Sequence, residues 1–423
     1  MSRDLTLAAA QAMDRADPMS GWRGEFHLPP GPDGRPATYL CGNSLGLQPK
    51  QAVAEVARVM AEWQCLAVLG HHGGGADWLT YQDRLAPSLG RLVGASPVEV
   101  TAMASLTINL HLLMASFFQP TRSRYAILVE AGAFPSDRYA MAAQLRHHRL
   151  DPADALVQVR PRPGEDCLRE DDIEAAIRRE GDRLALVLLP GVHYLTGQRL
   201  DMGRLARAAR EAGAAFGLDL AHAVGNVPLS LHDWGVDFAV WCSYKYLNAG
   251  PGATAGLFVH SRHHDADLPR LAGWYGHELR TRFRFDEAFV PERGAAGWQV
   301  SNGPILGMAP LAASLSQFDA AGLDALCARS VRLTGYLESL VDARLSGLVE
   351  VITPRRADAR GAQLSLRASG GRDAGRALFE RLAAAGVVCD WREPDVVRLA
   401  PAPLYNSFED CWRCVDAALS PSA

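Results

Sequence analysis

Six short apolar runs recur through the middle of the chain, and none of them alternates between hydrophobic and polar positions. They span residues 125–129, 155–159, 184–189, 214–220, 237–242 and 255–259. Runs of this length without alternation predict strands that are buried on both faces of a mostly parallel sheet. Amphipathic stretches at 170–180 and 201–213 predict helices between strands, the second ending near Gly213, a residue that tolerates the positive φ of a helix C-cap. The pattern therefore predicts an α/β core of repeated βα units.

The pattern changes in the last quarter of the chain. Residues 310–345 predict one long helix that begins after Pro310, and shorter alternating runs follow at 362–366 and 395–400. This change predicts a second, smaller α+β domain at the C-terminal end. The expected division is an N-terminal segment, 1–66, with a helix at each end and packing on the small domain, then a large domain, 67–309, and the small domain, 310–423.

Composition narrows the classes of function. The 423 residues carry 43 Lys and Arg against 47 Asp and Glu, a formal net charge of −4, and 48% are hydrophobic. These values are typical of a globular protein and give no sign of the clustered positive charge that binds nucleic acid or anionic membranes. Eight cysteines fit neither a disulfide scaffold nor a zinc motif, and no segment has the roughly 20 uninterrupted apolar residues of a membrane span. We expect a cytoplasmic protein that binds no nucleic acid, membrane or metal.

Lysine is rare in this chain, and one lysine has an unusual position. Of the 43 basic residues only Lys50 and Lys245 are lysines, and Lys245 follows the buried run 237–242 and precedes a Gly-Pro-Gly turn. An amine on rigid, partly buried backbone is favoured in its neutral, nucleophilic form. A surface lysine is the ordinary alternative, but the rarity and the context favour carbonyl chemistry at Lys245.

A carboxylate ends the preceding buried run. In the run 214–220, Asp219 comes just before the final residue, Leu220, and His222 follows two residues later. Ligands of open α/β sheets bind at the carboxyl ends of the strands, and a pyridoxal phosphate (PLP) ring needs an acid beside its pyridine nitrogen. Asp219 and Lys245 therefore fit one cofactor. Taken singly, Asp219 fits a helix N-cap and His222 a hydrogen-bonded core histidine equally well.

A helix N-terminus supplies a third element. Residues 105–109 follow an apparent strand and open a helix, where free N–H groups and the Thr107 hydroxyl form a phosphate site. Just past the next strand, Phe134 and Asp137 would place an aromatic ring and a carboxylate in the same crevice. Taken alone, residues 105–109 fit an ordinary capped helix without a phosphate site equally well.

Two further motifs indicate other chemistry. Gly42-Asn-Ser-Leu-Gly46 matches the G-x-S-x-G elbow of a hydrolase with Ser44 as nucleophile, but only about forty residues precede it, too few for an established sheet. Cys411-x-x-Cys414 resembles a redox pair, but it lies in a helix-like tail without a following βαβ unit. Both motifs are weaker than the PLP interpretation.

With these residues assembled, the chain resembles the kynureninases, PLP enzymes with the aspartate aminotransferase fold. The resemblance covers nearly the whole chain in ordered blocks, namely GNSLGLQPK at 42–50, LTINLH at 106–111, FPSD at 134–137, GVHYLTGQ at 191–198, the stretch 219–252, GWYGHELRTRF at 273–283, SNGPIL at 301–306 and VRLAPAPLYNSF at 397–408. It implies fold type I of PLP enzymes, with a mostly parallel seven-stranded sheet in the large domain. It also implies hydrolysis of L-kynurenine or 3-hydroxy-L-kynurenine to an anthranilate and L-alanine, in tryptophan catabolism or NAD precursor synthesis.

The resemblance assigns roles to matching positions. Lys245 is implied to bind PLP covalently and to move the Cα proton, Asp219 to pair with the pyridine nitrogen, and Tyr244 to donate a proton at Cβ. The further cofactor contacts that it implies are Leu106, Thr107, Phe134, Pro135, Ser136, Asp137, His222, Trp274 and Asn302. Because the positions matching Trp274 and Asn302 reach the phosphate from a neighbouring subunit, a homodimer with shared active sites is expected.

Substrate contacts are also implied. Arg398 matches the anchor of the substrate carboxylate, for which a guanidinium gives a bidentate fork, although a surface ion pair is the ordinary alternative. His71, Ser301 and Asn302 match contacts to the aryl ring, and Pro190 stands where many members carry serine. The alternatives are another fold type I enzyme, such as a cysteine desulfurase or an aminotransferase, or a PLP-fold protein without turnover. A desulfurase needs a cysteine on a mobile loop, whereas Cys327 falls in a helix predicted at 322–343.

Overall fold

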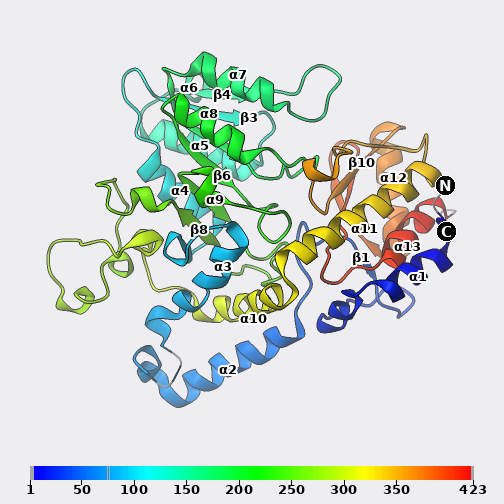
Figure 1. The fold of residues 1–423 in the computed structure, drawn as a ribbon, viewed down its shortest axis with the longest axis horizontal. Helices are drawn as coiled ribbons and strands as arrows, with labels where there is room; N and C mark the ends of the chain where they lie inside the picture. The colour runs from blue at the N-terminus through cyan, green and yellow to red at the C-terminus, as the bar shows by residue number, and fades with distance from the viewer. Residues whose placement is uncertain (1–3, 74, 76, 421–423) are drawn as a thin grey trace.

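A seven-stranded sheet forms the centre of the computed structural model, which describes residues 4–73, 75 and 77–420 (Figure 1). Its strands lie in the order β2 (Val100–Ala102), β8 (Gly256–Val259), β7 (Phe238–Trp241), β6 (Ala215–Asp219), β5 (Leu184–Pro190), β3 (Ala126–Glu130) and β4 (Leu156–Val159). Strand β8 is antiparallel to both of its neighbours, and the other pairs are parallel. The predicted mostly parallel sheet is therefore confirmed.

Both faces of this sheet are covered, as the apolar runs predict. Side chains such as Ile127 and Val129 share one core with α4 (Leu106–Phe117) and α5 (Pro135–His147). Leu128, between them, belongs to a second core on the opposite face, with helices α3 (Ala86–Val93), α7 (Glu170–Glu180), α8 (Met202–Glu211) and α10 (Ile305–Ala321). Because successive strand residues point to opposite faces, a strand covered on both sides is apolar at every position.

The long helix predicted at 310–345 is wrong as a single element. The segment forms two helices, α10 and α11 (Leu323–Arg344), separated by Gly322 with a φ of 78°. Pro310 lies inside α10 and does not start it. A proline removes the hydrogen bond to the carbonyl four residues earlier, here that of Leu306, which lies in the exposed first turn. Water can satisfy that carbonyl, so the helix tolerates the proline.

The C-terminal part forms a second layer of structure beside the sheet (Figure 1). Its four antiparallel strands lie in the order β12 (Asp390–Arg392), β13 (Val396–Leu399), β10 (Leu364–Ala368) and β9 (Val349–Val351), and they share a core with α11, α12 (Gly371–Ala384) and α13 (Phe408–Leu419). The N-terminal helix α1 (Leu7–Ala16) lies against α13, and β1 (Thr38–Tyr39) pairs with β11 (Val387–Val388). Helix α2 (Lys50–Leu66) lies against α10 instead. The exact domain boundaries stay a prediction.

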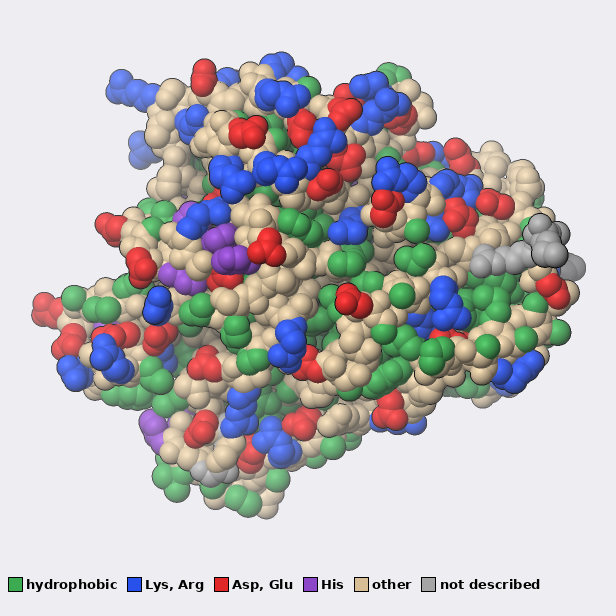
Figure 2. Space-filling view, in the orientation of Figure 1, with side chains coloured by type: hydrophobic (Ala, Val, Ile, Leu, Met, Phe, Trp, Pro, Cys, Tyr) green, Lys and Arg blue, Asp and Glu red, His purple; other side chains and the backbone are tan. Residues whose placement is uncertain are grey.

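The remaining α-helices of the described residues are the short α6 (Pro152–Ala155) and α9 (Leu231–Trp234), and several 3-10 turns join the elements. None of the helices that the structure describes has the length and hydrophobicity of a transmembrane span. On the face shown in Figure 2, acidic and basic side chains are interspersed. The carboxyl ends of β3, β5, β6 and β7 lie at one edge of the sheet, where parallel α/β folds place their ligands.

Candidate active site

A small cavity of about 140 Å³ lies at the carboxyl ends of the parallel strands. It is lined by the last residues of three strands, by the first turns of two helices and by the loop that follows β7. The lining residues are Leu106, Thr107, Glu130, Phe134, Ser136, Asp137, Pro190, Val192, Tyr194, Asp219, Ala221, His222, Tyr244 and Lys245. Nine residues predicted from the sequence are in this set, so the fold brings together segments that lie far apart in the chain.

Lys245 is held in a tight turn directly after β7. The Asn248 N–H donates to the Lys245 carbonyl at 3.0 Å, and the Ala249 N–H donates to the Ser243 carbonyl at 3.0 Å. Gly46 packs so closely on this turn that a Cβ there would overlap the carbonyl oxygen of Lys245. The Lys245 ammonium nitrogen lies 5.8 Å from the centroid of the Phe134 ring, near enough for a cation–π contact. The amine is thus placed on rigid backbone beside an aromatic face.

Three carboxyl groups share one side of the cavity. Asp219 accepts a hydrogen bond from the Ala221 N–H at 2.7 Å and is half-buried, whereas Glu130 and Asp137 are buried. Burial raises the pKa of Glu130 to about 8, and the charge of Asp219 contributes in the same direction. Burial also raises the pKa of Asp137 well above its usual value. Repulsion from the charge of Asp219 raises it further. Low dielectric and like charge therefore favour the protonated forms of Glu130 and Asp137.

His222 is a buried imidazole beside the amine. Burial lowers its pKa well below the usual value, and the positive charge of Lys245 lowers it further, so the ring is neutral. Its Nδ1 atom and the Oδ1 atom of Asp137 have no hydrogen-bond partner among the residues that the structure describes. Unpartnered buried polar atoms at a cavity wall indicate a polar ligand.

Two helix N-termini converge on the same cavity. Helix α4 begins at Leu106 and α5 at Pro135, and the Thr107 and Ser136 hydroxyl oxygens are 2.6 Å apart. The free N–H groups of such ends and their positive dipoles favour a phosphate. Together with the unpartnered atoms, the amine and the aromatic face, these residues fit a PLP molecule: an aldehyde to join the amine, a ring to stack, and a phosphate to bind.

Comparison with known proteins identifies the family. Residues 326–418 match the family model described as the kynureninase C-terminal domain. A kynureninase from Xanthomonas campestris pv. campestris strain B100 is 56% identical over 98% of this chain and 98% of its own length. One from Xanthomonas oryzae pv. oryzae strain PXO99A is 57% identical over 96% of each chain.

The chain belongs to the kynureninase family. The fold is shared more widely. A mutant of C-DES with glycine covalently linked to its PLP cofactor has a TM-score of 0.76 and 16% identity over 94% of this chain and 99% of that one. The cysteine desulfurase CsdA from Escherichia coli has a TM-score of 0.75 and 17% identity over 94% of this chain and 96% of that one. The predicted fold class, fold type I of PLP enzymes, is confirmed for this member of the kynureninase family.

Arg398 is buried, so the alternative of a surface ion pair is wrong for it. Its Nη2 lies 2.7 Å from Oδ2 of Asp390, its Nε donates to Oδ1 of Asp390 at 3.0 Å, and its Nη1 donates to the Tyr194 carbonyl at 2.6 Å. Arg398 does not line the cavity, but Tyr194 does. Two of the five guanidinium N–H groups, one on each Nη, have no role in these bonds and are the donors that a carboxylate would need.

The other predicted residues lie outside the cavity of their own chain. Trp274 is 46% exposed, and its indole N–H donates to the Arg282 carbonyl at 3.0 Å. Ser301 and Asn302 are exposed just before α10, and His71 is half-buried with its ring 5.5 Å from Trp78. Pro135 begins α5 between two cavity residues without lining the cavity itself. The structure of one chain therefore does not bring these residues to the site.

Sequence reasoning missed Glu130, Val192, Tyr194 and Ala221. Glu130 ends a buried apolar run just as Asp219 does, so the same signal at the carboxyl end of a strand would have found it. Tyr194 follows β5, and its ring meets Phe134 at 5.4 Å edge to face. Pro190, the expected departure from the family pattern, lines the cavity and has no N–H to donate.

The two rival motifs have structural explanations. Ser44 lies in a turn after β1, which is outside the seven-stranded sheet, and six residues before α2, so it is not on the sharp strand-to-helix turn of a nucleophile elbow. Gly42 and Gly46 are needed because a Cβ at either would overlap the Tyr405 hydroxyl or the lysine turn. Cys411 and Cys414 are buried on α13, and burial raises the pKa of both thiols, which disfavours redox chemistry.

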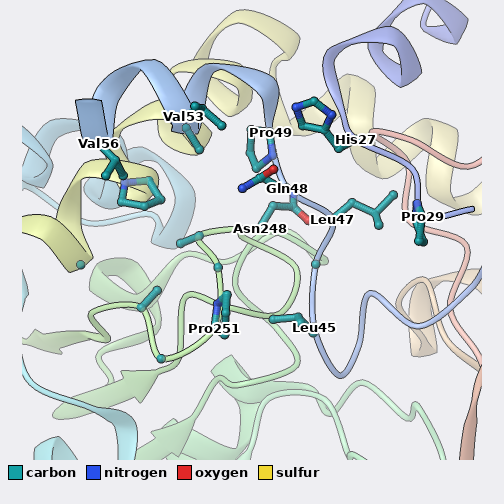
Figure 3. A pocket seen from close by; sticks show the side chains of 18 of the residues that line it. His27, Pro29, Leu45, Leu47, Gln48, Pro49, Val53, Val56, Asn248 and Pro251 are labelled. Carbon is teal, nitrogen blue, oxygen red and sulfur yellow. The ribbon is translucent and has the colours of Figure 1, made fainter. Parts of the chain in front are cut away.

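A larger, apolar cavity of about 710 Å³ lies behind the lysine turn (Figure 3). Residues 45–49, the first turns of α2, residues 248–253 and the start of α10 form its walls. None of its described lining residues is a lysine, an arginine or a carboxylate. Its polar groups do not converge as those of the smaller cavity do, so size alone does not locate the catalytic chemistry.

Proposed function

We propose that this chain is a PLP-dependent kynureninase. The reaction adds water across the Cβ–Cγ bond of L-kynurenine or 3-hydroxy-L-kynurenine and gives L-alanine and an anthranilate. The observation that carries this proposal is the shared cavity of Lys245 and Asp219 in a chain of the kynureninase family. By this function the enzyme would act in tryptophan catabolism or NAD precursor synthesis, in the cytoplasm.

Lys245 and Asp219 would carry the central roles. The amine of Lys245 would hold the PLP aldehyde carbon and then move the Cα proton of the substrate. Asp219 would pair with the pyridine nitrogen, and Phe134 would stack on the ring. When bound, PLP supplies an electron sink for the electron pair left at Cα. The chain supplies the orientation and the placement of charge around it.

The remaining cavity residues would hold the cofactor and handle a second proton. Leu106 and Thr107 on α4 and Ser136 on α5 would contact the phosphate, while Asp137 and His222 would bond ring substituents. Burial raises the pKa of the Tyr244 phenol well above its usual value, and Cys242 adds to this. A phenol that stays protonated at neutral pH is suited to donate a proton at Cβ.

A second copy of the chain would complete the site. Trp274 and Asn302 are exposed and lie outside the cavity of their own chain, which supports a contribution to the phosphate site of a partner subunit. The apolar side chains on the outside of α2, namely Val53, Met60 and Trp63, are also exposed and would be covered by such a partner. We therefore propose a homodimer with shared active sites.

The substrate would be held at both ends. Arg398 would bind its α-carboxylate through the free N–H groups of the fork, and His71, Ser301 and Asn302 would contact the aryl ring. A desulfurase is the second candidate by fold, but the described cavity lining contains no cysteine. Cys327 lies on α11, where burial raises the pKa of its thiol to about 11. Neither the described cavity lining nor Cys327 therefore offers the activated sulfur nucleophile that a desulfurase needs.

The test replaces each of the two lysines. Lys245→Ala should abolish the release of anthranilate from kynurenine, and the visible absorption of lysine-bound cofactor should be lost as well. Lys50→Ala is the matched control, because Lys50 is exposed at the start of α2 and should keep both properties. Unchanged turnover in Lys245→Ala would overturn the proposal. Sulfide release from cysteine, or keto acid formation without anthranilate, would favour another fold type I reaction.

A further inference from the structure

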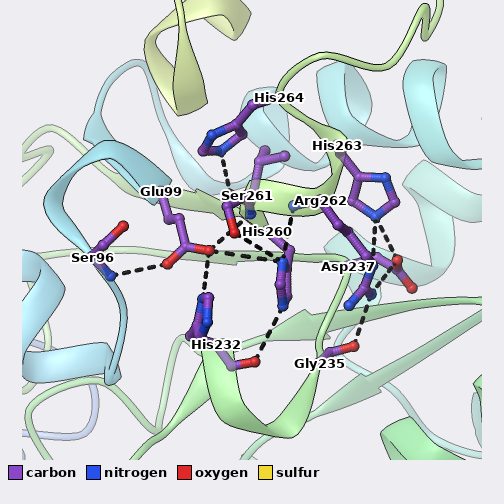
Figure 4. A network of polar contacts seen from close by, with 11 residues as sticks. Ser96, Glu99, His232, Gly235, Asp237, His260, Ser261, Arg262, His263 and His264 are labelled. Carbon is purple, nitrogen blue, oxygen red and sulfur yellow. Dashed lines mark hydrogen bonds and ion pairs between the residues drawn. The ribbon is translucent and has the colours of Figure 1, made fainter.

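Figure 4 shows a second cluster of ionisable side chains. The strand registers place it at the end of the sheet opposite to the cavity. Glu99 precedes β2, His232 lies on α9, and His260 follows β8. The antiparallel register pairs Val100 with Phe258 in β8, which brings Glu99 beside His260, and it pairs Phe238 at the start of β7 with Val259. The cluster is therefore at the amino end of β7, whereas Lys245 follows its carboxyl end.

The ligand atoms of the cluster converge. Oε1 of Glu99 lies 2.8 Å from Nδ1 of His232 and 3.8 Å from Nδ1 of His260, and one ligand atom from each residue lies within 4.8 Å of the others. Metal–ligand bonds of about 2.0–2.1 Å in a tetrahedral site would separate such atoms by about 3.4 Å. The two imidazole rings stack at 4.8 Å with 22° between their planes, and both point toward Glu99 in Figure 4. Small rotations of the two rings would bring these separations to those of a metal site.

The carboxylate is fully buried and held by the backbone. Glu99 is 0% exposed; its Oε2 accepts from the Ser96 N–H at 2.9 Å and its Oε1 from the Ser261 N–H at 2.8 Å. Outer hydrogen bonds of this kind orient a metal ligand. No arginine or lysine forms an ion pair with Glu99 in the described chain, so the buried carboxylate has only histidines as partners for its charge. A buried charge is stabilised by a counterion or a metal.

The site is open to solvent on one side. The His232 side chain is 48% exposed, so an ion can enter past it and can keep a water molecule as a fourth ligand. Histidine side chains gather on the face of the molecule shown in Figure 2. The bonds that His260 Nδ1 would give up are long, 3.2 Å from the Arg262 N–H and 3.4 Å to the Ser261 hydroxyl. Asp237 pairs with Arg262 and His263, so it does not compete for the ion.

We propose that Glu99, His232 and His260 bind a divalent transition-metal ion of the Zn²⁺ type. The donor set, two imidazoles and one carboxylate, is one that Zn²⁺ accepts. The ion would link η4 (Pro97–Glu99), α9 and the end of β8, and so stabilise the β2–β8–β7 edge of the sheet. No metal is expected from the sequence because these ligands come from three distant segments and match no spacing motif. The ion would be structural, since the cavity with Lys245 lies at the other end of β7.

The test uses the PLP-loaded full-length enzyme after removal of metal by a chelator. Isothermal titration with Zn²⁺ should give one bound equivalent, and Zn²⁺ should raise the melting temperature. Co²⁺ should give the visible bands of a site with nitrogen and oxygen ligands. His232→Ala should weaken Zn²⁺ binding by about tenfold or more and remove the Co²⁺ bands, because a ligand is lost. Its kynurenine turnover should equal that of the parent enzyme.

His147→Ala is the matched control, an exposed histidine on α5 outside the cluster, and it should bind Zn²⁺ as the parent does. His260→Ala provides a second ligand deletion and should lose binding as His232→Ala does. Equal Zn²⁺ binding by the parent and both ligand deletions would overturn the proposal, and so would the absence of a bound equivalent in the parent. Neither result bears on the proposed kynureninase activity, which is measured separately.

Discussion

Glu130 gives a direct test of the electrostatics inferred for the cavity. The residue ends β3, is 4% exposed, and its Oε2 atom has no hydrogen-bond partner among the residues that the structure describes. Burial raises its pKa to about 8 from an ordinary value of 4.5, helped by the charge of Asp219. Replacing Glu130 by glutamine keeps the shape of the side chain and removes the titration.

The sign of the effect follows from the two pKa values. An unfolded chain loses the Glu130 proton near pH 4.5, and the folded protein keeps it to about pH 8. Between these values the folded state binds one more proton, so the free energy of unfolding falls as pH rises and levels off above pH 8. At about 1.4 kcal/mol per pKa unit the total is about 5 kcal/mol, an upper bound because water penetration and relaxation reduce it.

The assay is urea unfolding of cofactor-free protein at pH 5.5 and pH 8.5, since a bound pyridine ring would add a charge beside Asp219. We expect the parent protein to lose up to about 3 kcal/mol more than Glu130→Gln over this range. Glu287→Gln, at an exposed position, should lose as much as the parent. The same pH dependence in Glu130→Gln and the parent would refute the inference that the carboxyl is held neutral by burial.

Two further substitutions test the architecture around the site. Gly46→Ala should lower the free energy of unfolding by about 1–3 kcal/mol and reduce turnover, because its Cβ would overlap the carbonyl oxygen of Lys245. Urea unfolding and kinetic assays measure the two effects. The control Gly21→Ala, where a Cβ meets nothing within 4 Å, should change neither stability nor turnover. Arg398→Lys should raise KM for kynurenine about 10- to 100-fold with a smaller change in kcat, because lysine cannot give a bidentate fork. Arg392→Lys, a more exposed partner of the same aspartate, should leave KM nearly unchanged, and an equal rise in both variants would contradict a carboxylate anchor at Arg398.

The sequence predicts the sheet and the centre of the cavity for one physical reason. Strands buried on both faces are apolar at every position, so their ends are visible in the sequence, and a polar residue at such an end must lie at an edge of the sheet. Asp219 ends β6 and Lys245 follows β7, and the structure places both in one cavity. Glu130 obeys the same rule, because it directly follows the apolar run 125–129 and ends β3.

Contacts between distant segments could not be predicted in this way. The pairing of Arg398 with Asp390 depends on the register of β12 against β13, which aligns these two residues opposite each other. The G-x-S-x-G pattern is misleading for the same reason. Its two glycines are required by the approach of Tyr405 and of the lysine turn, which both come far later in the chain. A short motif indicates that small residues are required at these positions. It does not indicate which distant segment packs against them.

Residues that only the family resemblance suggested differ in their position from residues that physical reasoning also indicated: most of the former lie outside the cavity, and the latter line it. Lys245, Asp219 and Thr107 have local reasons for their positions, at a strand end or a helix N-terminus, and they meet in a single chain. Trp274, Asn302 and most of the other positions known only from the resemblance do not reach that cavity. For Trp274 and Asn302 this difference is expected if a second copy supplies them, because the burial and hydrogen bonding of one chain cannot indicate a contact that forms only between two. Trp274 stays 46% exposed although its indole N–H is bonded to the Arg282 carbonyl of its own chain, and a partner surface would cover the exposed part.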